Sequence, residues 1–208
     1  MKSLNRILTN ADREYFKPMI EKMFEVCPEM MARKIGAANV QQAFALDYIL
    51  KLLKNSNATL CCAGSFEDTV TEYLKRIGNS VVDIDPAVNM DLHKFRTATE
   101  RKFDIVFSVS VLEHVINDEE FIDDMCFLLN PGGTGVVTCD FNNSYTKGMP
   151  LPATDVRFFT RHDLEERLVK VLQRNACALV EEPDYTAEPD FIYQGHLYSF
   201  ATFVFKKV

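Results

Sequence analysis

Residues 103–115 read FDIVFSVSVLEHV, and residues 128–140 read LLNPGGTGVVTCD. Each stretch contains a short apolar run, which predicts buried β-strands over 103–108 and 135–139. An acidic segment with apolar residues at helical spacing lies between them and predicts a helix from about 118 to 129. The Pro-Gly-Gly sequence in the second stretch predicts a turn before its strand. A strand, a helix and a second strand in this order indicate a parallel sheet covered by helices.

The same alternation extends upstream. It predicts strands over 59–63 and 80–84, with a helix over 69–76 between them. Only 18 residues lie between Asp85 and Asp104, too few for a helix, a further strand and their connections. We therefore expect the sheet to be abridged at this point.

The C-terminal part of the chain continues the pattern. Thr160 and Asp163 have the spacing of a capping box, which predicts a helix over 161–175. Two runs rich in aromatic and β-branched residues follow, at 178–182 and 198–205, and a polar loop joins them. We expect these two runs to pair as antiparallel strands.

The N-terminal region, residues 1 to about 57, has helical periodicity. Pro18 is expected in the first turn of a first helix, the position where proline is tolerated. Asn39 is expected to cap a second helix. These helices are predicted to form a cap on the same domain as residues 58–208. They either cover the edge of the sheet or act as a lid over a site.

Composition limits the classes of function. The 208-residue chain has a formal net charge of −7, which argues against nucleic-acid binding because phosphate neutralisation needs a basic surface. No apolar run is long enough to span a membrane, and the N-terminus does not read as a secretory signal. The six cysteines form no CxxC pair and are expected to be buried in a reducing compartment, which favours a cytoplasmic location.

The order strand, VLEHV, helix, LNPGG and strand over residues 103–140 resembles the second half of the class I methyltransferases, in particular the type 11-like subgroup with LEHV and PGG motifs. The resemblance covers roughly residues 58–207. It implies S-adenosylmethionine as the cofactor and methyl transfer as the activity. It also implies an α/β, Rossmann-like, mostly parallel sheet of seven strands, which a C-terminal antiparallel hairpin completes.

In open α/β sheets, ligands bind beyond the carboxyl ends of the strands. The first such end carries Ala63, Gly64 and Ser65, and Gly64 would let the backbone approach a ligand closely. Asp85 ends the next strand 21 residues after Gly64, the spacing expected of a carboxylate that accepts hydrogen bonds from ribose hydroxyls. Asp83 is the competing residue, but only Asp85 lies at the tip of the strand.

The resemblance implies the remaining cofactor contacts. Asp91 and Leu92 correspond to residues at the adenine edge. Ser108, Val109 and Ser110 correspond to the loop that lies against the methionine part of the cofactor.

The glycine loop departs from the pattern of the family. The family has an acidic residue where this chain has Cys62, and further glycines where it has Phe66 and Asp68. One alternative is therefore a non-catalytic binding module that has kept the fold. A second alternative is a nucleotide-binding dehydrogenase, which the spacing of Asp85 also fits.

His114 and Asp140 are the candidate catalytic residues, because both are expected at the reactive edge of the sheet. His114 would titrate near neutral pH and is either a general base or a residue that holds the loop and helix start. The pair Glu113 and His114 resembles part of the magnesium site of small-RNA terminal methyltransferases. Here Ser110 replaces an acidic ligand and no second histidine follows, so no metal is expected.

The segment 141–159 is too long for a minimal connection and leaves a strand at the reactive edge. Asn142, Tyr145 and Arg157 are the residues expected to bind the acceptor. The alternative for Arg157 is an ion pair with Asp155 on a solvated loop. The expected substrate is a small polar molecule, with a sugar or a nucleotide-sugar as the first candidates.

Overall fold

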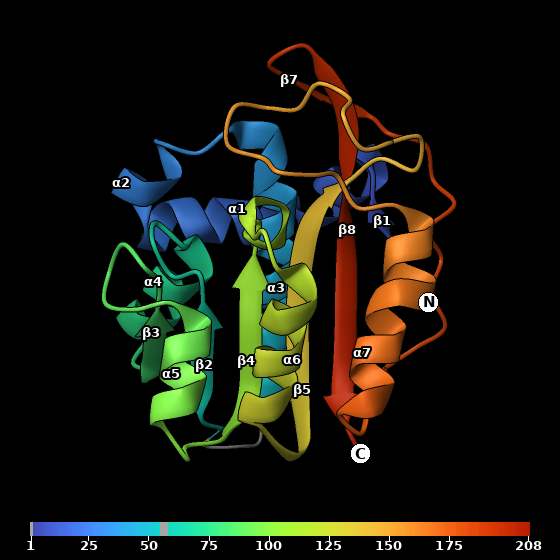
Figure 1. Ribbon diagram of the computed structural model, residues 1–208. Helices are drawn as coiled ribbons and strands as arrows, with labels where there is room; N and C mark the ends of the chain where they lie inside the picture. The colour runs from blue at the N-terminus through green and yellow to red at the C-terminus, as the bar shows by residue number, and fades with distance from the viewer. Residues whose placement is uncertain (1, 55–57) are drawn as a thin grey trace.

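The computed structural model describes residues 2–54 and 58–208 and contains one eight-stranded β-sheet (Figure 1). Four strands run parallel in the order β3, β2, β4 and β5, and β8 lies antiparallel beside β5. The short strands β1, β6 and β7 each pair antiparallel with β8. The strands are Ile7–Leu8 (β1), Leu60–Ala63 (β2), Val81–Ile84 (β3), Phe103–Val109 (β4), Leu129–Phe141 (β5), Cys177–Leu179 (β6), Phe191–Tyr193 (β7) and His196–Lys207 (β8).

This topology confirms the predicted α/β, Rossmann-like, mostly parallel sheet, including the antiparallel pairing near the C-terminus. Over the described residues the sheet has eight strands and not the seven that the resemblance implies, because one strand is missing where the sheet is abridged and β1 and β7 each add a short strand beside β8. The abridgement is at the predicted place. β3 lies at one end of the sheet, and α5 (Leu92–Ala98) leads from it directly back to β4.

Helices cover both faces of the sheet, and Figure 1 shows the two layers. One layer consists of α5, α6 and α7, whose apolar residues pack on one side of β4, β5 and β8. The other consists of α1, α3 and α4, which pack on the opposite side. Besides α5, the helices are α1 (Asn10–Val26), α2 (Pro28–Met31), α3 (Asn39–Leu53), α4 (Thr69–Arg76), α6 (Asp118–Leu128) and α7 (Leu168–Arg174). Shorter helical turns are η1 (Gly36–Ala38), η2 (Leu112–His114) and the π-helical η3 (Asp163–Arg167).

Two predicted helix starts were wrong, and one was confirmed. The first helix begins at Asn10, so Pro18 lies in its interior. The helix α3 follows the turn η1, so Asn39 is already its first residue and Ala38 takes the cap position. By contrast, the Asp163 carboxylate accepts hydrogen bonds from the Thr160 amide (2.9 Å) and hydroxyl (2.7 Å), as the capping box predicts.

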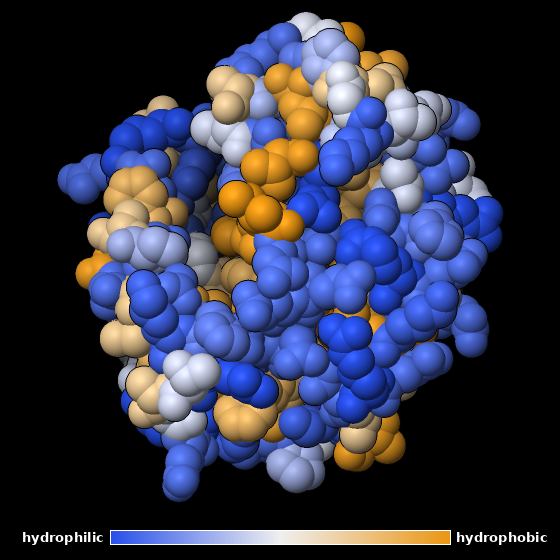
Figure 2. All heavy atoms as spheres, in the orientation of Figure 1, coloured by the Kyte–Doolittle hydropathy of each residue, from blue (hydrophilic) through white to orange (hydrophobic). Residues whose placement is uncertain are grey.

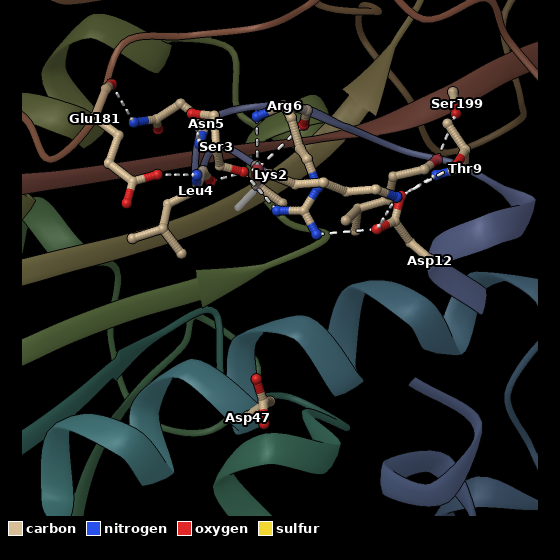
Figure 3. A network of polar contacts seen from close by, with 12 residues as sticks. Lys2, Ser3, Leu4, Asn5, Arg6, Thr9, Asp12, Asp47, Glu181 and Ser199 are labelled. Carbon is tan, nitrogen blue, oxygen red and sulfur yellow. Dashed lines mark hydrogen bonds and ion pairs between the residues drawn. The ribbon is translucent and has the colours of Figure 1, made fainter. Parts of the chain in front are cut away.

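Polar contacts hold the N-terminal segment together and join it to the rest of the molecule (Figure 3). Asp12 lies 3.0 Å from Arg6 and 3.0 Å from Lys2, and it accepts the Thr9 amide at 3.0 Å. The Asn5 side chain accepts the amide of Val204 in β8 at 2.6 Å. This segment is therefore part of the same folded body as the sheet. The domain boundary expected after residue 57 adjoins residues 55–57, which lie outside the described residues.

The environment of the cysteines agrees with the sequence prediction, since all six side chains are buried and unpaired. Among residues 2–54 and 58–208, no helix has the length and apolar character needed to cross a membrane.

Asp12→Ala should lower the free energy of unfolding by about 3 kcal/mol, because it leaves Arg6 without its partner in a largely buried position. Burial raises the pKa of Asp12, but the hydrogen bonds from Thr9, Lys2 and Arg6 outweigh it and lower the pKa below its ordinary value of 3.8. The stabilisation should therefore be present above pH 3.8 and be lost as the pH falls through the lowered pKa.

Urea unfolding at several pH values measures this effect. The matched control is Asp47→Ala in α3, whose partner Lys51 is exposed, and it should cost at most about 0.5 kcal/mol. Equal losses in the two variants would contradict the role given to Asp12.

Candidate active site

A cavity of about 890 Å³ opens at the carboxyl ends of β2, β3 and β4, beside the N-terminal halves of α5 and α6. Figure 2 shows a hollow on this face of the molecule, bordered by hydrophobic side chains. The volume is that of a small-molecule or cofactor site. A second cavity, of about 660 Å³ beside α1 and α3, contains none of the predicted site residues. The larger cavity is lined by six of them: Gly64, Asp85, Asp91, Leu92, Ser110 and His114.

Gly64 has a left-handed backbone (φ +88°), and its amide donates to the carbonyl of Ile84 at 2.8 Å. A Cβ atom at this position would lie 2.4 Å from a methyl group of Val111. The space beside the glycine is therefore filled by Val111, where the sequence suggested the close approach of a ligand. Ala63 and Ser65 flank Gly64 but do not line the cavity.

Asp85 lies at the tip of β3, as predicted. Its carboxylate accepts the amides of Phe66 (3.2 Å) and Ala87 (2.7 Å), so it connects the glycine loop to the turn after β3. The competing residue Asp83 forms an ion pair with Lys75 of α4 and does not line the cavity. Of the two carboxylates, only that of Asp85 can reach a ligand there.

Asp91 and Leu92 line the cavity at the start of α5. The Asp91 carboxylate caps this helix by accepting the Lys94 amide at 2.8 Å, and it pairs with the Lys94 ammonium at 3.0 Å. The hydrogen bond from the Lys94 amide, followed by that from its side chain, lowers the pKa of Asp91. The charge of Asp91 therefore also stabilises the local backbone.

Of the three predicted residues at the end of β4, only Ser110 reaches the cavity, while Ser108 and Val109 are buried in the strand. Ser110 has a left-handed backbone (φ +57°), which is uncommon for serine and is held by hydrogen bonds from its amide to Thr138. Its hydroxyl donates to Glu113 at 2.8 Å. The backbone thus turns sharply where the strand meets the cavity.

His114 lines the cavity with part of its ring exposed. Its Nδ1 lies 3.1 Å from the carbonyl oxygen of Thr154 and 3.2 Å from the carboxylate of Asp155. The hydrogen bond with Asp155 raises the pKa of His114 above 6.5, although burial opposes it. The segment after β5 therefore orients this histidine and favours its protonated form.

Asp140, the other candidate catalytic residue, does not line the cavity. It is almost fully buried at the end of β5, and its backbone carbonyl accepts the amide of Phe159. Burial, followed by the charges of Glu113 and Asp155, raises the pKa of Asp140 well above its ordinary value. In this conformation Asp140 cannot exchange a proton directly with a molecule in the cavity.

The residues expected to bind an acceptor hold their own loop in place. The Asn142 side chain donates to the carbonyl of Leu197 at 2.9 Å, and the Tyr145 ring packs against Phe158. Arg157 pairs with Asp118 at 2.8 Å and not with Asp155, so the ion pair considered as the alternative for Arg157 is not formed. None of the three predicted acceptor residues lines the cavity.

Other cavity residues were not found from the sequence. Thr154 and Val111 come from loops, and Phe121 and Asp124 lie one helical turn apart on α6. The three-residue spacing on α6 was the available signal, but it could not show which face of the helix borders a cavity. Among the described parts of the chain, no group of three or more His, Cys, Asp or Glu side chains is arranged to hold a metal ion.

A family model described as a methyltransferase domain matches residues 37–171, more than half of the chain. The chain belongs to the methyltransferase family. This confirms the predicted S-adenosylmethionine-dependent methyltransferase and its cofactor, and it favours this class over the dehydrogenase. No curated protein matches the sequence.

Solved structures share the fold at low sequence identity. TehB from Haemophilus influenzae is 14% identical with a TM-score of 0.55, over 79% of this chain and 62% of TehB, so the match spans less than two thirds of that protein. The 1,6-didemethyltoxoflavin N1-methyltransferase of Burkholderia thailandensis is 15% identical (TM-score 0.55), over 97% of this chain and 92% of that one. The magnesium protoporphyrin IX methyltransferase of Synechocystis PCC 6803 is 12% identical (TM-score 0.54), over 95% and 100%. The last two structures contain bound S-adenosylhomocysteine.

Gly64→Ala should destabilise the methyltransferase by about 2–4 kcal/mol, because the added Cβ both strains the left-handed backbone and collides with Val111. Gly148→Ala is the matched control. Gly148 also has a positive φ but nothing within 4 Å of its Cβ position, so only the backbone cost of about 1–2 kcal/mol remains. Thermal unfolding measures both, and Val111→Ala should recover part of the Gly64→Ala loss. No recovery would contradict the packing argument.

Asp155→Asn should lower the pKa of His114, since the carboxylate of Asp155 is the main cause of its elevation. The ion pair stabilises the fold below the unfolded pKa of 6.5, and this contribution is lost as the pH rises through the raised pKa. The variant should therefore be less stable than the parent at pH 6 and equally stable at alkaline pH. NMR titration of the His114 ring measures the shift, and Asp47→Asn, which changes a carboxylate outside this cavity, should leave it unchanged.

Proposed function

We propose that this methyltransferase transfers a methyl group from S-adenosylmethionine to a hydroxyl group of a small polar molecule, with an uncharged sugar as the favoured class. The observation that supports this most is the convergence of Asp85, Ser110 and His114 on one cavity of cofactor size. Asp85 follows β3, and Ser110 and His114 follow β4. Both are parallel strands of one sheet, and ligands of open α/β sheets bind at these strand ends.

The residues of the cavity fit the cofactor. Each oxygen of the Asp85 carboxylate accepts one backbone amide and retains capacity for a ribose hydroxyl. Asp91 and Leu92 border the part of the cavity where the adenine would lie. Ser110, which follows β4 on the far side of β2, would lie toward the methionine end. Because the glycine loop is shielded by Val111, we assign the main cofactor contacts to these other residues.

The bound cofactor supplies a methyl group on a positively charged sulfur, and the protein has to position the acceptor and remove its proton. When His114 is neutral, an Nδ1–H group can donate to Asp155 and to the carbonyl of Thr154. This arrangement leaves Nε2, which lies 4.0 Å from the Glu113 carboxylate, as the proton acceptor. We therefore propose His114 as the general base, oriented by Asp155.

The charged residues in and near the cavity indicate which class of acceptor it can bind. Among residues 2–54 and 58–208, no lysine or arginine lines the cavity. Arg157 and Arg161, which could have bound a phosphate, pair with Asp118 and Glu165 respectively. A nucleotide-sugar would place its phosphates without a cationic partner, so an uncharged sugar is favoured.

Asp85→Ala should weaken the binding of S-adenosylhomocysteine by about 1.5–3 kcal/mol, the range for loss of hydrogen bonds to a charged group. Calorimetric titration of the folded variant provides the measurement. Asp83→Ala is the control, since it removes the neighbouring carboxylate that lies outside the cavity, and it should leave the affinity nearly unchanged. If Asp83→Ala caused the larger loss, the ribose contact would have to be reassigned.

His114→Gln should lower kcat by about 10²–10⁴-fold, the usual contribution of a general base, while the affinity for S-adenosylhomocysteine stays nearly constant. The assay measures release of S-adenosylhomocysteine with a panel of sugars and their nucleotide derivatives. We expect turnover with uncharged sugars. Turnover confined to the nucleotide derivatives would refute the acceptor class, and full kcat in the variant would refute the base.

A further inference from the structure

Three carboxyl groups gather behind the wall of the cavity, at the ends of β4 and β5. Glu113 in η2 is completely buried, and Asp140 at the end of β5 is 5% exposed. Asp155 lies in the loop after β5, with 3% of its side chain exposed. The group borders the cavity through Ser110, which donates to Glu113 at 2.8 Å, and through His114, which contacts Asp155.

These carboxyl groups are incompletely satisfied. Each has one buried oxygen without a hydrogen-bond partner among residues 2–54 and 58–208. Within the same residues, the only ion-pair partner of Glu113 and Asp155 is His114, and Asp140 has none. An unpaired buried carboxylate costs free energy, so the site favours any ligand that brings a positive charge or a hydrogen-bond donor.

The neutral side chain of Gln41 also has an oxygen that lacks a hydrogen-bond donor. Gln41 of α3, which is 2% exposed, donates to the Ser110 hydroxyl at 3.4 Å. Its side-chain oxygen is buried and has no partner in the described part of the chain. An amide oxygen is an acceptor, as are the carboxylates. Gln41 and Glu113 both hydrogen-bond the Ser110 hydroxyl, so two of the four unpaired acceptor oxygens belong to side chains in direct contact with this turn.

The lining of the cavity is also rich in acidic residues. Besides His93 and His114, the ionisable residues that line it are all acidic: Glu67, Asp85, Asp91, Glu120 and Asp124. Burial raises the pKa of both Glu113 and Asp140, and a positive charge placed beside them would shift these pKa values back down. The site can therefore respond to a cation by becoming more negative.

We infer that Glu113 and Asp140, buried behind the cavity lining at Ser110, become negatively charged when a cation binds and so form an anionic wall that selects the positively charged form of the cofactor over its neutral product. This inference rests on the proposed placement of the methionine end of the cofactor near Ser110. S-adenosylmethionine carries a positive charge on its sulfur, and S-adenosylhomocysteine carries none there. The wall lowers the free energy of the charged ligand only, so it favours binding of the cofactor and release of the product.

Calorimetric titration with three ligands tests the inference: S-adenosylmethionine, S-adenosylhomocysteine and sinefungin, an unreactive analogue with an amine in place of the methylated sulfur. Wild-type protein should bind sinefungin and S-adenosylmethionine at least roughly tenfold more tightly than S-adenosylhomocysteine, which corresponds to about 1.4 kcal/mol. Glu113→Gln should bring the ratio close to one while the affinity for S-adenosylhomocysteine is retained. Asp123→Asn on α6, outside the cavity, is the control and should keep the wild-type ratio.

The outcomes separate the two proposals. If none of the three ligands binds to folded wild-type protein, the proposed function fails. If all three bind equally, the cofactor site stands and the anionic wall is refuted. If Glu113→Gln does not fold, Asp140→Asn provides the second variant, and a wild-type ratio in a folded variant of either residue overturns its assignment.

Discussion

The pairing of β8 with β5 is the interaction on which most of the architecture depends. Eight residue pairs join the two strands, from Thr134 with Lys206 to Phe141 with Ser199. The close approach requires a glycine, because a Cβ atom on Gly135 would lie 2.2 Å from the ring of Phe205. β8 also pairs with β1, β6 and β7, so a single C-terminal strand joins the N-terminal segment to the parallel half of the sheet.

The LEH sequence in the middle of the site places three neighbouring side chains in three different environments. Leu112 is buried in the apolar layer of α5, α6 and α7, Glu113 is buried beside Ser110, and His114 reaches the cavity. The short turn η2 makes this divergence possible, since successive residues of a tight helical turn point in different directions. A packing residue, a buried acid and a titratable group are therefore held at fixed positions by only three residues.

Asp118, at the start of α6, holds the loop after β5 and the helical turn η3 in place. Asp118 pairs with Arg157 of the long loop at 2.8 Å and with Arg167 of η3 at 2.7 Å. These contacts draw the loop over the ends of the strands, and the loop in turn brings Thr154 and Asp155 to His114. The loop thus acts on the site through the position of its backbone and through Asp155, while its arginine supports the structure.

The sequence alone determined the features that arise from local pattern and chain spacing. The apolar runs located β2 to β5, Thr160 and Asp163 located a helix start, and the distance from Gly64 placed Asp85 at the correct strand end. The short connection before Asp104 also predicted the abridged sheet, because chain length limits what can be built between two strands. These signals are readable since each depends on residues that are close together in the sequence.

Only the tertiary structure decided which residues face the cavity. Val111 covers Gly64, Asp118 forms an ion pair with Arg157, and the loop after β5 buries Asp140. All three contacts join segments that are far apart in the chain. Helix α1 continues through Pro18 and is held against α3 by tertiary packing, although local propensity disfavours proline there. Burial and charge pairing are properties of the packed molecule, so a pattern of residue types can indicate a site but cannot show which of its side chains remain free to bind.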